Sequence, residues 1–161
     1  MVMRRMLGLT LAALLAACSA NSGEAGAQST QNAAVHPQSG LAVVPLTVTH
    51  SGQQHVFRVE VARTEQEQAK GLMFRTAMGA DEGMIFPMNP PRGAAFWMRN
   101  TVLPLDILFI GVDGKVSNIA ANARPYDETP LESVGLVKGV LELNAGRAAE
   151  LGIVPGDSVS W

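Results

Sequence analysis

Two acidic residues, Asp106 and Glu142, lie inside apolar stretches of this sequence and are the first candidates for chemistry. Asp106 interrupts the run Leu-Asp-Ile-Leu-Phe-Ile, and Glu142 interrupts the run Val-Leu-Glu-Leu. In a strand, side chains alternate between the two faces, so Asp106 would share an apolar face with Leu108 and Ile110. A buried carboxylate costs several kcal/mol unless it is paired or hydrogen-bonded. Both acids therefore need specific partners.

Arginines near the predicted ends of strands and helices are the natural donors to these acids. The functional interpretation is a polar pocket that combines the two acids with an arginine and is walled by an aromatic ring. Its candidate residues are Arg75, Trp97, Asn100, Thr101, Asp106 and Glu142, with Arg63 and Arg99 as further possible donors. The structural alternative is a buried network of ion pairs and hydrogen bonds that fixes the register of the strands.

Such a pocket leaves two functions open. The favoured one is a non-catalytic module that binds a small molecule, a glycan or a protein partner, with Trp97 against the ligand. The alternative is a hydrolase that cleaves an envelope glycan with Asp106 and Glu142 as a pair of catalytic carboxyl groups. That reaction requires both groups in one open cleft, about 5 to 9.5 Å apart.

Metal binding is a third hypothesis. The chain after the leader has five methionines within a short stretch, and thioethers bind soft ions such as Cu(I). These residues are Met73, Met78, Met84, Met88 and Met98. Methionine more often fills irregular gaps in an apolar core. The histidines His50 and His55 flank one predicted turn without a third ligand, so no metal site and no cofactor is assigned.

The N-terminus has the pattern of an export signal. Arg4 and Arg5 precede a short apolar run, which is too short to span a bilayer. The single cysteine, Cys18, follows Leu-Ala-Ala, as in the lipobox of bacterial lipoproteins. Residues 1–17 are therefore predicted to be a signal peptide and Cys18 a lipidated residue. Cleavage after Ala27, which would release a soluble protein, is the alternative.

The leader and the segment that follows it lead us to expect an exported protein. Residues 18–40 are rich in small and polar residues and are predicted to form a flexible tether. We expect a lipid anchor at Cys18 on the periplasmic side of the envelope, with Ser19 slightly favouring the outer membrane. The formal net charge is −2, and no run of five basic residues exists, so nucleic acid is not an expected partner.

Residues 41–161 are predicted to form one globular domain of the α+β class that is mainly β. The strand candidates include a hairpin of residues 46–49 and 56–61 around Ser51-Gly52. The other strand candidates are residues 84–88, 94–98, 105–111, 115–120, 139–143 and 158–161. Thr64 and Glu67 form a capping box for a short helix that stops at Gly71. Asn144 would cap a second helix of about two turns. Both helices must pack on an antiparallel, barrel-like sheet.

Several motifs of this domain resemble the domain-of-unknown-function family 192. They are Gly-Leu-Met with Arg75, Gly-Met-Ile-Phe at residues 83–86, the run at 96–106, Val-Leu-Glu-Leu-Asn-Ala-Gly at 140–146, and Leu-Gly-Ile through Gly-Asp at 151–157. The resemblance implies a compact β-rich domain with small helices in an exported protein. It implies no activity, substrate or cofactor. The family often has a lysine where this chain has Arg99, and either residue keeps the positive charge.

Overall fold

The computed structural model describes residues 34–161, so the predicted signal peptide and the lipidation of Cys18 lie outside the described residues. The strands are β1 (Ala34–Val35), β2 (Ala42–His50), β3 (Gln53–Val61), β4 (Glu82–Arg92), β5 (Ala95–Phe96), β6 (Leu105–Gly111), β7 (Val116–Ala123), β8 (Leu131–Glu132), β9 (Val137–Asn144) and β10 (Ser158–Ser160). The helices are α1 (Glu65–Lys70) and α2 (Arg147–Glu150). The domain is therefore mainly β with two short helices, as predicted.

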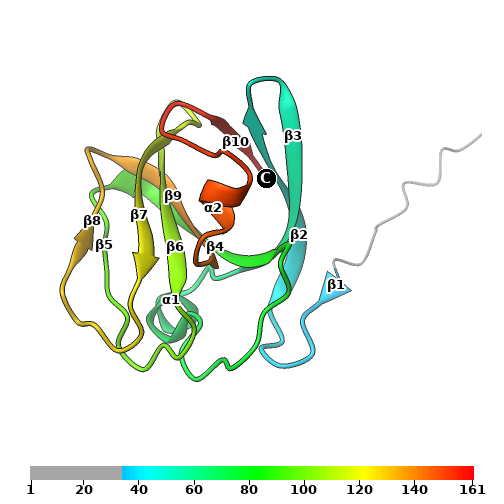
Figure 1. Cartoon of the computed structure of the whole chain (residues 1–161). Coiled ribbons are helices and arrows are strands. Elements are labelled where there is room, and N and C mark those ends of the chain that lie inside the picture. The colour runs from blue at the N-terminus through cyan, green and yellow to red at the C-terminus, as the bar shows by residue number, and fades with distance from the viewer. Residues whose placement is uncertain (1–33) are drawn as a thin grey trace, which may run out of the picture. The chain divides into compact units, whose positions relative to one another are not determined.

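One curled sheet dominates the domain (Figure 1). It has eight strands in the order β1-β2-β3-β4-β9-β6-β7, with β10 paired to β2 beside β1. An isolated bridge between Lys115 and Ser158 brings the start of β7 to β10. The sheet thus curls toward a barrel without forming a closed one. All its strand pairs are antiparallel except β3 with β4, which makes it a mixed sheet.

The parallel pair follows from the segment that contains α1. A chain that returns to pair in parallel must cross over, and residues 62–81 provide this crossover between β3 and β4. The capping box begins α1 as predicted, because the Thr64 side chain accepts from the Glu67 backbone N–H and the Glu67 carboxylate accepts from Thr64. The Gly71 N–H bonds to the Glu67 carbonyl and ends the helix.

The strands β4, β9 and β6 are buried on both faces, because two apolar clusters sandwich them. One cluster fills the inside of the curled sheet, and α2 packs into it with Ala148 (Figure 1). The other cluster covers the opposite face and includes Phe86, Met98 and Phe109. The separate two-stranded sheet of β5 and β8 lies against this second cluster through Phe96 and Leu131.

Two expectations need correction. Asn144 does not cap α2, because it is the last residue of β9, and Gly146 occupies the cap position without a side-chain hydrogen bond. α2 is also a single turn. In addition, the fold includes part of the predicted tether, because β1 pairs with β2 and Ser39 bonds to Glu60. Among residues 34–161, no helix is long and apolar enough to cross a membrane.

Candidate functional site

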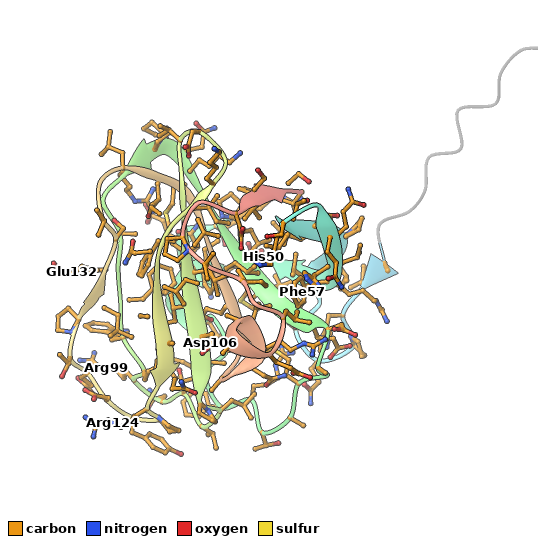
Figure 2. The ribbon with its side chains drawn as sticks, turned by 45° about the horizontal axis from the view of Figure 1, so that its top comes forward. His50, Phe57, Arg99, Asp106, Arg124 and Glu132 are labelled. Carbon is orange, nitrogen blue, oxygen red and sulfur yellow. The ribbon has the colours of Figure 1, made fainter. Side chains whose placement is uncertain are left out.

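Asp106 lies on the inner face of the sheet and stabilises the fold there. Its side chain is fully buried and points to α2, beside which Figure 2 labels it. One carboxylate oxygen accepts from the Ala148 backbone N–H at 2.9 Å, and the other accepts from the Asn122 N–H at 2.9 Å. Ala148 lies in the first turn of α2, where backbone donors have no partner within the helix. Asp106 therefore caps α2 from a distant strand, and none of the arginines in residues 34–161 pairs with it.

Glu142 has a different environment on the other face. Its register partners are Met84 on β4 and Ile107 on β6, both of which belong to the outer apolar cluster. The residue is only 5% exposed, and no described group hydrogen-bonds its carboxyl group. Burial raises the pKa of Glu142 to about 8, since the charged form is the one that loses its hydration. At neutral pH this side chain is mainly an uncharged acid.

The two acids consequently do not form a catalytic pair. They emerge on opposite faces of the sheet, and Asp106 is sealed in the core with both oxygens bonded to backbone. The two-carboxylate hydrolase requires an open cleft that holds both groups. The structure contradicts this arrangement.

The arginines also pair elsewhere. Arg75 is buried in a bidentate ion pair with Glu60, in which its two terminal nitrogens lie 2.5 and 3.0 Å from the carboxylate oxygens. Arg99 bonds to Glu128 at 2.6 Å on the surface, and this pairing lowers the pKa of the Glu128 carboxyl. The buried acid that takes up Arg75 is thus Glu60, which the sequence analysis did not select.

A hollow of about 320 Å³ opens beside Glu142. We call it the Glu142 pocket. Its walls come from α1 and the following turn, from β4, from β5 and from the loop after β5. The lining residues include Gln68, Lys70, Gly71, Met73, Phe86, Met88, Arg92, Phe96, Trp97, Thr101 and Glu142. Of the six predicted site residues, the structure brings Trp97, Thr101 and Glu142 together here.

The turn that follows α1 has to lie close to the pocket's aromatic wall. Gly71 has φ +46°, and a Cβ atom there would lie 3.3 Å from the Phe86 ring. Phe86 in turn packs edge-to-face against Phe96 with ring centroids 5.0 Å apart. Glycine at this position therefore allows both the helix stop and the close approach.

Asn100 lies in the segment that carries Trp97 and Thr101, and its amide lies 3.9 Å from the sulfur of Met73, a lining residue. Asn100 has φ +54°, and its carbonyl accepts from the Phe74 N–H at 2.9 Å. Phe74 and Tyr126 are also left-handed at φ +63°, and the Tyr126 N–H bonds to the Met98 and Thr101 carbonyls. Three strained non-glycine residues thus brace the segment that carries Trp97 and Thr101. Such strain is found where a functional loop must hold one shape.

A second, larger hollow of about 690 Å³ lies on the other side of the turn after α1. Its lining includes Arg75, Ser39 and Phe74. The guanidinium of Arg75 is already neutralised by Glu60, so this hollow offers no buried group without a partner comparable to Glu142. We therefore place the candidate site in the smaller pocket.

The methionines and histidines considered as metal ligands have roles in packing and hydrogen bonding instead. Met84, Met88 and Met98 are buried in the outer apolar cluster, where thioethers fill core space. His50 bonds through Nδ1 to both oxygens of Asp157 at 3.1 Å. Among residues 34–161, no group of three or more His, Cys, Asp or Glu side chains is placed to hold a metal. Ser51 lies near His50 but is exposed at the hairpin tip and lines neither hollow.

The pocket contains residues that sequence reasoning missed. Gln68 and Lys70 come from α1. Phe86 comes from the strand predicted at residues 84–88, for which the sequence indicates no role beyond the apolar core. The only signal for Gln68 in the sequence is its place in the short helix that the capping box predicts. Its amide donates to the Ala62 and Pro87 carbonyls at 3.2 and 3.0 Å, which fixes α1 to the sheet.

Similarity to known proteins agrees with this architecture. The family DUF192, described as Uncharacterized ACR, matches residues 46–161. A protein of unknown function from Novosphingobium aromaticivorans is 64% identical, with 82% of this chain and 94% of that chain covered and a TM-score of 0.79. A Sinorhizobium meliloti protein described as "a putative transcription regulator" is 41% identical, with 74% and 94% covered and a TM-score of 0.72. Among curated proteins, none matches. The chain belongs to the family DUF192.

Proposed function

We propose that this domain is a non-catalytic module that binds a small molecule in the Glu142 pocket. The observation that carries the proposal is the Glu142 carboxyl group: the residue is only 5% exposed, and its carboxyl group borders the pocket without a hydrogen-bond partner among the described residues. A carboxyl group that faces a pocket and is not engaged by the protein is free to bond to a ligand there. The volume of about 320 Å³ falls in the range of small-molecule sites.

We further propose that the module works on the periplasmic side of the cell envelope, anchored through lipid at Cys18. The apolar leader and the lone cysteine support this placement. The description of the Sinorhizobium relative suggests DNA binding instead. The acidic net charge of −2 and the lack of a basic run argue against that role for this chain.

A fragment screen by protein-observed NMR on the full chain tests the binding proposal. The chain has two tryptophans, of which Trp97 lines the pocket while Trp161 packs against Lys138 and Gly139. We expect diverse fragments to shift the Trp97 indole signal and to leave Trp161 unchanged. Glu142→Met should abolish most of these shifts, whereas Glu132→Met, at an exposed acid on β8, should retain them. Fragments that bind elsewhere, or no binding at millimolar concentrations, would refute the proposal.

A further inference from the structure

The polar group at the inner end of the pocket is an uncharged carboxylic acid. Such a group has one O–H donor and one carbonyl acceptor side by side. Two uncharged polar side chains of the lining are engaged: Gln68 donates to two carbonyls and accepts from Arg92, and the Thr101 hydroxyl donates to the Arg99 carbonyl. A ligand that satisfies Glu142 must therefore offer an acceptor and a donor next to each other. An amide or lactam has this pattern.

The middle of the pocket favours a flat ring. Phe86, Phe96 and Trp97 line it together with the thioethers of Met73 and Met88. Aromatic faces and polarisable sulfur pack well against aromatic rings. Together with Leu72, these five supply the large apolar and polarisable side chains of the lining that would contact the body of a ligand.

The rim of the pocket is positive. Lys70 and Arg92 are exposed lining residues, and Glu142 is the only acidic residue in the lining. Within the part of the chain that the structure describes, neither cation is held by a salt bridge, and Arg92 has only one long hydrogen bond, at 3.4 Å to Gln68. Because a neutral Glu142 does not offset these charges, the rim attracts an anion and repels a cation.

We propose that the Glu142 pocket takes a compact aromatic amide or lactam that also carries an anionic group. The amide end pairs with the Glu142 carboxyl group, the ring lies between the aromatic walls, and the anion lies toward Lys70 and Arg92. This inference rests on the proposed small-molecule function and names the chemical class of its ligand.

Four benzene derivatives test the proposal against the full chain by calorimetry. They are 3-carbamoylbenzoate, which has the amide and the anion; benzamide and benzoate, which each have one of them; and 3-(aminomethyl)benzamide, which has the amide and a cation. We expect 3-carbamoylbenzoate to bind about tenfold more tightly than benzamide or benzoate, and the cationic amide to bind least. Binding of 3-carbamoylbenzoate should weaken as the pH rises through about 8, because ionised Glu142 cannot donate.

Variants separate the two ends of the ligand. Glu142→Gln keeps a donor and an acceptor, so its affinity should stay within a few fold and lose the pH dependence. Glu142→Met keeps the shape and should weaken 3-carbamoylbenzoate about tenfold. The double variant Lys70→Ala with Arg92→Ala changes exposed residues. It should reduce the affinity for 3-carbamoylbenzoate to that for benzamide, and leave benzamide unchanged.

Three results would overturn the inference: stronger binding of the cationic amide, equal binding of benzoate and 3-carbamoylbenzoate, or an affinity that does not depend on Glu142. If these results came with fragments that still bind beside Trp97, the ligand class would be wrong and the binding function would stand. If no fragment and none of the four compounds bound, both proposals would fail.

Discussion

Asp106 and Glu142 lie on adjacent strands but on opposite faces of one sheet. Asp106 pairs in register with Leu143, and Glu142 pairs with the next residue of β6, Ile107. Because side chains alternate along a strand, this offset of one residue sends the two carboxyl groups into different apolar clusters. One of them caps a helix, and the other faces a pocket. The same sequence feature, an acid in an apolar run, thus has two unrelated roles.

The helix-capping role predicts that Asp106 matters for stability and not for ligand binding. Asp106→Asn keeps one acceptor and presents an NH₂ group to the second backbone N–H. We expect the free energy of unfolding to fall by about 2 kcal/mol, the scale of a lost hydrogen bond to a charged group. Urea unfolding measures this change. Asp113→Asn, in an exposed turn, is the control and should change stability far less. Loss of fragment binding at the pocket without loss of stability would contradict this assignment.

The raised pKa of Glu142 predicts that the free energy of unfolding falls as the pH rises. Its pKa is about 8 in the folded protein and near its ordinary value of about 4.3 when unfolded. Between these values the folded state holds a proton that the unfolded state has lost, so this group makes stability fall as the pH rises. Over the range from about pH 5 to about pH 8 the effect amounts to about 4 kcal/mol.

Comparison with Glu142→Gln isolates this effect from all other titrating groups. The amide cannot ionise, so the variant should match the natural protein at pH 5 and exceed it in stability by several kcal/mol at pH 8. Chemical denaturation at both pH values gives the difference. A constant difference between the two proteins across this range would show that Glu142 ionises normally.

Local signals in the sequence predicted the elements that depend on few neighbouring residues. The β2–β3 hairpin follows from alternation around Ser51-Gly52, and α1 follows from the pair Thr64 and Glu67. Each of these features satisfies its own backbone within a few residues.

Long-range partners could not be predicted in this way. The donor that Asp106 receives from Ala148 lies 42 positions away along the chain. A cap supplied by another strand leaves no signal near α2, so Asn144 was the best local candidate and was wrong. In the same way, the sequence indicates Arg75 as a possible donor to a buried acid, but no local signal points to its partner Glu60, which lies in β3.

The lipid anchor gives a prediction about localisation. If Cys18 is acylated, the chain carries two or three acyl groups and stays in the membrane fraction, because several chains hold firmly where one does not. Cys18→Ser should move the protein to the soluble fraction and abolish labelling with radioactive palmitate. Mass spectrometry of the mature N-terminus provides the control, since cleavage after Ala27 would leave an unmodified chain that begins at Gln28. Unchanged fractionation of the variant would refute the anchor.

The buried pair Arg75–Glu60 and the surface pair Arg99–Glu128 should differ in how much they contribute to the free energy of unfolding. Arg75 and Glu60 have side chains only 8% and 5% exposed, so Arg75→Ala leaves a buried carboxylate without its partner. Ser39 and His36 gather around the same carboxylate, which ties the segment after β1 to β3. We expect Arg75→Ala to lower the free energy of unfolding by about 3 to 5 kcal/mol.

Arg99→Ala is the matched control for this prediction. Arg99 and Glu128 form a close pair as well, but both side chains are about half exposed, so water replaces the lost partner. The midpoint of unfolding should barely move. Replacing both buried partners, with Arg75→Met and Glu60→Leu, should restore much of the loss, because no unpaired charge then remains in the core. If Arg75→Ala proved as mild as Arg99→Ala, the buried pair would contribute no more than a surface contact, and the segment after β1 would need another explanation for its position.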